Sequence, residues 1–392
     1  MTKLTRRAWI SGGTALAANM ALARSGSAAV ATSVRRSSFT PGEIWLDTAG
    51  KPIQAHAGSI LQVGSQYFWY GENKEFTTGK TEVWTWGVRC YSSTDLYNWD
   101  DLGLIIPPNT EDRNSPLHPA AGLDRPHILY NARTKQFVCW IKLLTNTQQT
   151  RTVLVADRIT GPYQIAHQNI LPLGMSAGDF DLVVSPDDGK AYMYFERVHS
   201  ELICADLTDD YTRFTGYYST HFPRPGPPLV REAPAYFRRD HKHYLATSGT
   251  TGYFPNPSEI AVADTYHGPF AVQGDLHPTD RSRTSFNSQI SSIFKHPKKA
   301  DLYIALADRW IGPQSGAEFD GGETSRTVQS GFSKVFASPR QPLTPTEQTA
   351  MGNWAGLNLN TSLARYVWLP IRFNGEHPVI EWRSEWRLDE FD

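Results

Sequence analysis

Short apolar runs, alternating or continuous, recur along this chain between clusters of polar turn residues. The runs are rich in aromatic and β-branched residues and are bounded by Gly, Pro, Asn or Asp, which is typical of β-strands. The clearest predicted strands are residues 59–63, 67–70, 127–130, 137–141, 191–195 and 302–306. Helical periodicity is scarce, and only a turn or two of helix is predicted, near residues 344–351. The pattern therefore predicts an all-β protein.

A weak repeat groups these strands into larger units. In each copy a strand ends in small residues and an Asp, a turn follows, and an aromatic residue comes next; the copies are residues 92–99, 155–163, 204–211 and 262–270. The spacing of roughly 50–60 residues suits one four-stranded blade of a β-propeller with its loops. No Pro- or Ser-rich linker divides the chain after residue 31. We predict one five-bladed β-propeller domain over residues 32–392, because the repeat disfavours the alternative, an array of β-sandwiches.

Residues 1–31 have the pattern of an export signal. The basic start contains the pair Arg6-Arg7, a short apolar stretch follows, and Ala29-Val30-Ala31 provides a small-x-small cleavage site. Paired arginines favour the bacterial twin-arginine route over an ordinary secretory signal, which is the alternative. The apolar stretch is shorter than the ~20 residues of a membrane span. We therefore expect a periplasmic or secreted protein with no membrane attachment once the signal is removed.

Composition changes this picture little. The net charge is −1 and no basic run is present, so neither nucleic acid nor a lipid surface is an expected partner. Cys90, Cys139 and Cys204 each lie in an apolar, strand-like segment, which favours buried thiols over disulfides or a zinc site. We expect a monomer that requires no cofactor, and no set of ligands is strong enough to indicate a metal ion or a cation at the propeller centre.

Three acidic elements stand at the starts of successive predicted β-units. They are Asp124-Arg125-Pro126, Gly178-Asp179-Phe180-Asp181 and Arg231-Glu232-Ala233-Pro234. Carboxylates at the starts of propeller blades converge on one axis, so these groups are expected to share a site. Cleavage of a glycosidic bond needs a carboxylic acid that protonates the leaving oxygen, with other charged groups around it. The pattern therefore predicts a glycosidase site.

The chain resembles glycoside hydrolase family 43, and within it the branch of the exo-β-1,3-galactanases. The matching segments keep their order and spacing along nearly the whole chain after the signal. They are residues 44–48, 53–61, 67–74, 124–127, 231–234, 247–249, 288–289, 308–310 and 366–370. The resemblance implies a five-bladed propeller with its active site at one end of the axis, and an oligo- or polysaccharide substrate.

The resemblance also assigns the acid. It places the family's general acid at Glu232, and the second carboxylate, which orients the acid and tunes its pKa, at Asp179 in preference to Asp181. Burial raises the pKa of a carboxyl group, so Glu232 is expected to carry a proton near neutral pH. A structural ion pair between Arg231 and Glu232 is the competing interpretation.

The sequence differs from most of the family at the residue that activates the attacking water. The usual Asp near the start of the first blade is missing from Ala55-His56-Ala57-Gly58. The galactanase branch shares this absence, and there a Gln, thought to act through its imidic acid form, holds the water; Gln289 occupies that position. We expect its amide across the cavity from Glu232, about 6.5–9.5 Å away, as inversion requires. Packing between blades is the alternative role for Gln289.

The remaining candidates are contacts to the sugar. Asp124 matches a position that is usually Glu in the galactanase branch, so its shorter side chain is expected to lose or alter one hydroxyl contact. The other predicted substrate contacts are His56, Glu72, Asp181, Tyr253, Asn256, Glu259 and Trp310. Glu72 is also a candidate to assist the water, whereas His56 is more often a core residue. Composition alone predicts an aromatic wall at Trp84 and Trp86.

Taken together, these features predict an exo-acting glycoside hydrolase that inverts configuration and acts on β-1,3-galactan of the arabinogalactan type. An α-L-arabinofuranosidase or β-galactofuranosidase of the same family is the alternative. A non-catalytic carbohydrate-binding propeller is the alternative from another class, because the usual base is absent. Retention of Glu232 in the acid motif argues against that alternative.

Overall fold

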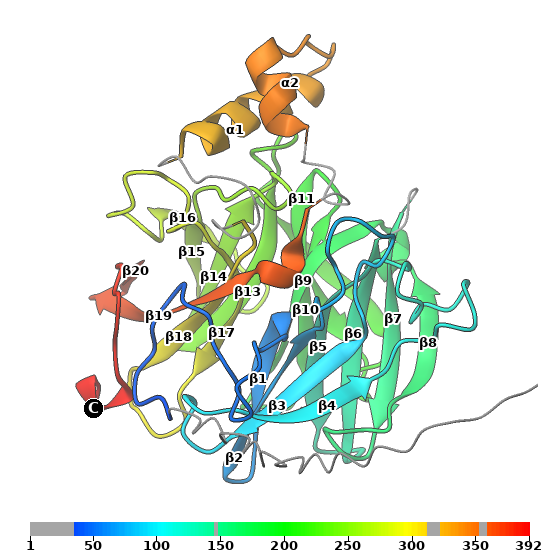
Figure 1. Ribbon diagram of the computed structural model, residues 1–392. Helices are drawn as coiled ribbons and strands as arrows, with labels where there is room; N and C mark the ends of the chain where they lie inside the picture. The colour runs from blue at the N-terminus through cyan, green and yellow to red at the C-terminus, as the bar shows by residue number, and fades with distance from the viewer. Residues whose placement is uncertain (1–34, 145–147, 312–321, 353–358) are drawn as a thin grey trace, which may run out of the picture. The chain divides into compact units, whose positions relative to one another are not determined.

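The computed structural model describes residues 35–144, 148–311, 322–352 and 359–392 of the chain (Figure 1). Within these ranges the strands form five four-stranded antiparallel sheets, arranged as the five blades of a β-propeller. The predicted fold class is therefore confirmed. The predicted export signal, residues 1–31, lies outside the described residues. No helix in the described ranges is long and apolar enough to cross a membrane.

The four strands of each blade follow one another in chain order across the sheet. They are β1 (His56–Val63), β2 (Gln66–Glu72), β3 (Val88–Ser93) and β4 (Asp100–Ile106) in blade 1; β5 (Leu123–Asn131), β6 (Gln136–Leu144), β7 (Gln149–Ala156) and β8 (Gln164–Ile170) in blade 2; β9 (Ala177–Val184), β10 (Ala191–Arg197), β11 (Glu201–Leu207) and β12 (Phe214–His221) in blade 3; β13 (Arg231–Arg239), β14 (Lys242–Gly249), β15 (Glu259–Ala263) and β16 (Ala271–Asp275) in blade 4; and β17 (Gln289–Lys295), β18 (Tyr303–Arg309), β19 (Arg365–Asn374) and β20 (His377–Ile380) in blade 5.

The first strands of the blades form the inner ring of the propeller. Each contacts the first strand of the next blade, and β17 contacts β1. Residues outside the sheets complete the closure: the Phe39 N–H donates to the Trp386 carbonyl at 2.9 Å, and the Trp386 N–H donates back at 3.1 Å. The two rings stack with centroids 4.2 Å apart. Both belong to a hydrophobic cluster that contains Trp45, Trp69 and Trp368, so the two ends of the chain share one core.

The sequence repeat marks the third strand of blades 1 to 4. Its copies cover the ends of β3, β7, β11 and β15 and the turns that lead to the fourth strands. In the first copy the Asp95 carboxylate accepts from the backbone N–H groups of Tyr97 and Asn98 at 2.9 and 2.8 Å, which stabilises the turn. In blade 5, residues 310–364 separate β18 from the third strand, β19, and the repeat is not found there.

A β-bulge interrupts each first strand near the same end. The register shifts at this point in β1, β5, β9, β13 and β17. In three of these strands the bulge contains Ala57, Arg125 or Ala233, each with a φ of 47–48°. Residues other than glycine seldom adopt this left-handed conformation, and a bulge re-aims the side chains beside it. The bulges therefore determine where the side chains at this end of the inner ring point.

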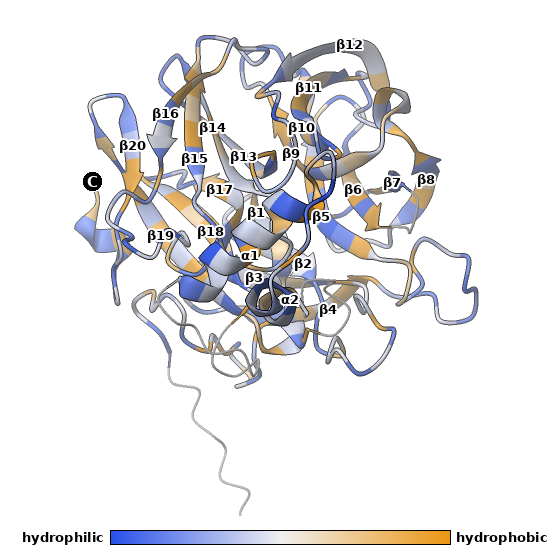
Figure 2. Cartoon of the chain, turned by 90° about the horizontal axis from the view of Figure 1, so that it is seen from above, coloured by the Kyte–Doolittle hydropathy of each residue, from blue (hydrophilic) through white to orange (hydrophobic). Residues whose placement is uncertain are grey.

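Two helices pack on this end of the propeller, α1 (Glu323–Val335) and α2 (Pro345–Met351) (Figure 2). The second lies where a short helix was predicted, and the Thr344 hydroxyl caps it by accepting from the Glu347 N–H. Helix α1 was not predicted from the sequence, because its many Ser, Thr and Gly residues give a weak helical signal. Contact with α2 stabilises it: a Cβ on Gly331 would lie 2.0 Å from the sulfur of Met351. Short 3₁₀ turns cover Pro172–Gly174, Thr361–Leu363 and Leu388–Glu390.

The three cysteines lie in β3, β6 and β11. Cys90, Cys139 and Cys204 are buried and unpaired, so the prediction of buried thiols is confirmed. Burial raises the pKa of all three thiols, that of Cys90 to about 12.

Candidate active site

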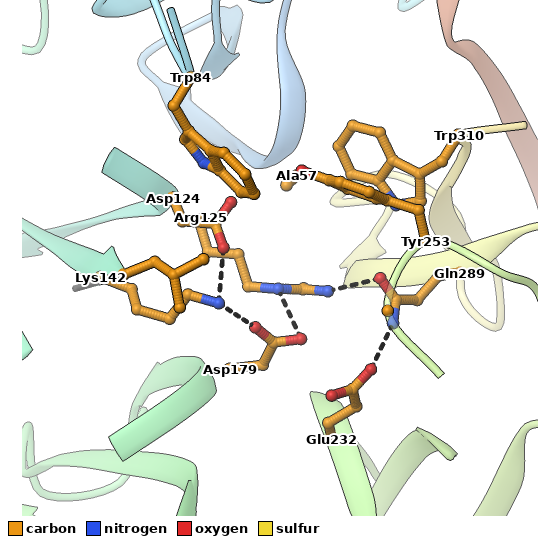
Figure 3. A pocket seen from close by; sticks show the side chains of 12 residues that line it. Ala57, Trp84, Asp124, Arg125, Lys142, Asp179, Glu232, Tyr253, Gln289 and Trp310 are labelled. Atoms are coloured by element: carbon orange, nitrogen blue, oxygen red, sulfur yellow. Dashed lines mark hydrogen bonds and ion pairs between the residues drawn. The ribbon is translucent and has the colours of Figure 1, made fainter. Parts of the chain in front are cut away.

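A cavity of about 180 Å³ lies at the bulged end of the inner ring (Figure 3). Each of the five first strands contributes to its wall: Ala57, Asp124 with Arg125, Asp179, Glu232 and Gln289. The rest of the wall consists of Trp84, Lys142, Leu144, Gly252, Tyr253 and Trp310. The structure thus brings together Glu232, Asp179, Gln289, Asp124, Tyr253 and Trp310 from the predicted site.

Two cations and two carboxylates form a network along the cavity wall. The Lys142 ammonium lies 2.5 Å from Asp124 Oδ2 and 2.6 Å from Asp179 Oδ1. The Arg125 guanidinium reaches the other oxygen of Asp179, at 3.0 Å. Lys142 stands opposite Asp124 in the β5–β6 register, so strand pairing alone places this ion pair. The four charges of this network cancel.

An amide joins this network to the predicted acid. Arg125 Nη2 donates to Gln289 Oε1 at 2.8 Å, while Gln289 Nε2 donates to Ser248 Oγ at 3.0 Å and to Glu232 Oε1 at 3.4 Å. The expected distance of 6.5–9.5 Å between Gln289 and Glu232 is therefore wrong. The two side chains come from the adjacent strands β13 and β17, and both turn toward the same part of the cavity (Figure 3).

Burial and the network separate the pKa values of the three carboxyl groups. Burial raises the pKa of Glu232 well above its ordinary value, and the charges of Asp179 and Glu196 raise it further. Burial also opposes ionisation of Asp124 and Asp179, but the nearby cations outweigh burial and lower both pKa values. The site therefore favours the protonated form of Glu232 and the charged forms of Asp124 and Asp179.

Two charged residues close to Glu232, Arg231 and Glu196, are held in place by specific contacts. Arg231 turns away from Glu232 and donates to the hydroxyl and carbonyl of Thr247 at 2.9 and 2.7 Å. Among the described residues no ion pair joins Arg231 to Glu232, which disfavours the purely structural interpretation of this carboxyl. A Cβ on Gly178 would lie 1.9 Å from Glu196 Oε2, so glycine is required there for Glu196 to approach the site.

Five predicted contacts are not among the described residues that line the cavity: His56, Glu72, Asp181, Asn256 and Glu259. Each is held elsewhere by other groups. His56 bonds to Asp308 at 2.9 Å, and Glu72 lies 2.6 Å from the Lys74 ammonium. Asp181 accepts from the Tyr236 N–H at 2.6 Å and faces a second cavity along the axis. Asn256 cross-links its own loop, and Glu259 faces a separate cavity beside Arg224 and Arg231.

Glu72 does not line the cavity, but it holds the backbone of Arg125, which does. It has no exposed surface, and it accepts from the backbone N–H of Arg125 at 2.8 Å. Burial and the adjacent charge of Asp124 raise the pKa of Glu72 to about 8.

The two predicted wall tryptophans also differ: Trp84 lines the cavity, whereas Trp86 packs on Phe76 with ring centroids 5.0 Å apart.

The sequence analysis missed Lys142 and Arg125 as site residues. Lys142 had a signal, since it is the only charged residue in the apolar run 137–144. A lysine in a buried strand needs an anionic partner, which the cross-strand position of Asp124 provides.

Among the described residues no group of three or more His, Cys, Asp or Glu side chains is arranged to hold a metal ion.

The sequence profile of glycosyl hydrolases family 43 matches residues 51–320, more than half of the chain. The chain belongs to this family. Residues 51–320 therefore have the sequence of a glycoside hydrolase domain. No curated protein sequence matches it.

Solved structures of family members resemble this enzyme over most of its length. A family 43 β-1,3-galactosidase aligns with a TM-score of 0.68 at 26% identity, over 90% of this chain and 64% of that one. A second β-1,3-galactosidase, solved with galactodeoxynojirimycin, aligns with a TM-score of 0.66 at 26% identity, over 89% of this chain and 100% of that one. The exo-β-1,3-galactanase of Phanerochaete chrysosporium, with β-1,3-galactotriose bound, shares the fold with a TM-score of 0.70 at 23% identity, over 90% and 68%. The enzyme thus spans less than two thirds of the first of these structures.

The network predicts a change in the pH profile when Asp179 loses its charge. In Asp179→Asn the negative charge that helps to raise the pKa of Glu232 is gone. The positive charges of Arg125 and Lys142 are then offset by one carboxylate fewer. The pKa of Glu232 then falls, so the alkaline limb of kcat/KM, where the acid loses its proton, moves to lower pH. Asp181→Asn is the matched control on the same strand. A limb that moves in the control but not in Asp179→Asn would contradict the assignment.

Proposed function

We propose that this enzyme removes single terminal sugars from β-1,3-galactan of the arabinogalactan type, with inversion of configuration. The observation that carries the proposal is a small cavity with the buried carboxyl of Glu232 in its wall, and burial raises the pKa of this carboxyl. Pockets for drug-sized ligands span about 300–1,000 Å³, so a cavity of about 180 Å³ suits one sugar unit at a chain end. Its position at the end of the inner ring favours exo action.

Glu232 is the proposed general acid. Its proton passes to the glycosidic oxygen as the bond to the terminal sugar breaks, and the leaving chain departs as an alcohol. Asp179 is a positioning residue, because its charge keeps the proton on Glu232 until substrate is bound. The cations that hold Asp179 also limit the rise of the acid's pKa, since Arg125 and Lys142 lower it. Asp124, charged and on the cavity wall, is the proposed acceptor for sugar hydroxyls.

Gln289 is proposed to act with Glu232, and its contacts define how. Its oxygen is engaged by Arg125 and its nitrogen by Ser248 and Glu232, so in this arrangement the amide orients the acid. To hold the attacking water on the opposite side of the sugar, the amide has to turn away from Glu232 as substrate enters. An amide is a poor base, so Gln289 positions the water. The proton that the water loses as its oxygen bonds to the sugar passes to bulk water, from which Glu232 regains its proton.

The choice of galactan rests on the two β-1,3-galactosidases with 26% identity. A furanosidase of the same family is the second candidate, because Asp124 is shorter than the Glu usual in the galactanase branch. A raised pKa at Glu232 argues against a non-catalytic binding protein. We also propose export of the enzyme, on the pattern of residues 1–31, since a polymeric substrate lies outside the cell.

A release assay tests the substrate and the acid together. We expect galactose from β-1,3-galactotriose and little turnover of nitrophenyl α-L-arabinofuranoside or β-galactofuranoside. Glu232→Gln should lower turnover of the triose by at least about a hundredfold, and turnover of an aryl galactoside by less, because an activated leaving group needs less protonation. Glu259→Gln, outside the cavity, is the control. Wild-type rates in Glu232→Gln would remove this residue from the mechanism.

Proton NMR of the first product tests the stereochemistry. The expected product from a β-linked substrate is α-galactose, which then equilibrates with the β-anomer. Direct inversion passes through no covalent glycosyl-enzyme, so added methanol should give no methyl glycoside. Release of the β-anomer, or formation of a methyl glycoside, would show a retaining mechanism.

Replacement of Gln289 separates catalysis from packing. We expect Gln289→Ala to lower turnover by at least about a hundredfold, since it loses both orientation of the acid and a site for water. Gln289→Glu should retain some activity with a shifted pH optimum, because a carboxyl at this position titrates together with Glu232. Turnover and thermal unfolding are measured on one preparation. A loss of stability with turnover within a few-fold of wild type would make Gln289 a packing residue.

A further inference from the structure

Three aromatic side chains, Trp84, Tyr253 and Trp310, form one wall of the cavity, termed here the aromatic roof (Figure 3). They come from segments of blades 1, 4 and 5. The Trp84 and Tyr253 rings lie 6.1 Å apart between centroids, and the Tyr253 and Trp310 rings lie 5.0 Å apart. In the view of Figure 3 the roof lies on the other side of Arg125 from Asp179 and Glu232.

The spacing of these rings closes this side of the cavity. Centroid distances of about 4.5–7 Å are those of aromatic rings in direct contact, so no sugar ring passes between them. We propose that the aromatic roof blocks the pocket beyond the terminal sugar, and that Trp84 sets which substituents this sugar can carry. This inference rests on the proposed exo action and adds Trp84 as the residue that limits which substituents the terminal sugar can carry.

Trp84 is held by a buried charge cluster. Its carbonyl accepts from Lys74 Nζ at 2.9 Å and from the Thr77 hydroxyl at 2.8 Å. The Lys74 ammonium also lies 4.9 Å from the centre of the indole ring, a cation–π contact. Lys74 is in turn paired with Glu72 at 2.6 Å, and neither side chain is exposed. Glu72, predicted to touch the sugar, thus supports the roof instead.

The other half of the roof is backed by the helices. Trp310 belongs to a hydrophobic cluster with Phe254, Val328, Phe332 and Met351, and Tyr253 packs against it. The Ser325 hydroxyl of α1 donates to the carbonyl of Pro255, next to this cluster. Both ends of the roof are therefore fixed by contacts outside the cavity.

A pair of substrates tests the roof. One is β-1,3-galactotriose, and the other is the same triose with its non-reducing unit capped as the 4,6-O-benzylidene acetal. Wild type should cleave only the uncapped triose. Trp84→Ala should cleave the capped triose with a kcat/KM at least about tenfold above wild type, the discrimination that one small pocket contact supplies. Trp86→Ala, two residues away and packed on Phe76, should behave as wild type.

The outcomes separate the roof from the substrate assignment. Cleavage of the capped triose by wild type, or no cleavage of it by a folded Trp84→Ala enzyme, overturns the role of Trp84. Thermal unfolding checks folding, and Trp84→Leu, which keeps apolar cover over Lys74, replaces the alanine variant if that variant is unfolded. If wild type does not cleave the uncapped triose, the galactan assignment fails instead. The capped and uncapped pair is then built on the glycoside that wild type cleaves, with the same criteria.

Discussion

The Lys142 ammonium is the charge on which the candidate active site depends. It is buried, yet it remains charged because Asp124 and Asp179 lie 2.5 and 2.6 Å away and outweigh the cost of burial. Two carboxylates this close to one another and to Glu232 would otherwise compete for protons. The cation favours the ionised form of both, and burial together with the charge of Asp179 in turn raises the pKa of Glu232. Removing one partner from such a buried pair costs about 3–5 kcal/mol, so the network is also part of the stability of the fold.

The propeller makes this network from residues far apart in the sequence. Every first strand carries a bulge near its start, and every one contributes a side chain to the cavity. The inner ring supplies the acid, both aspartates and Arg125, the neighbouring strand β6 supplies Lys142, and segments outside the strands supply the aromatic roof. The chemistry thus lies on rigid strands, and the limits on the substrate lie on connections that can vary without moving the strands.

The sequence predicted the architecture well, because the repeat and the strand pattern are local properties. It also indicated Asp124, Asp179 and Glu232, since each precedes or begins a strand-like run. It could not separate Trp84 from Trp86, because their direction depends on how residues 73–87 pack against Lys74. The distance between Gln289 and Glu232 depends on the placement of adjacent blades, which no local pattern contains. Lys142 is visible in the sequence as the one charge in an apolar run, but only the register of β5 and β6 reveals its partner.

The pairing of Phe39 with Trp386 has a consequence for how this molecule folds. The contact joins residues near opposite ends of the described chain, and the cluster around it also packs Trp45, which precedes the first blade, against Trp368 of the last blade. Such a non-local contact forms late, because the loop it closes is nearly the whole domain. Until blade 5 is in place, large aromatic surfaces of blade 1 stay open to water. The circular architecture therefore leaves apolar surface that favours aggregation on the chain until its last strands are in place.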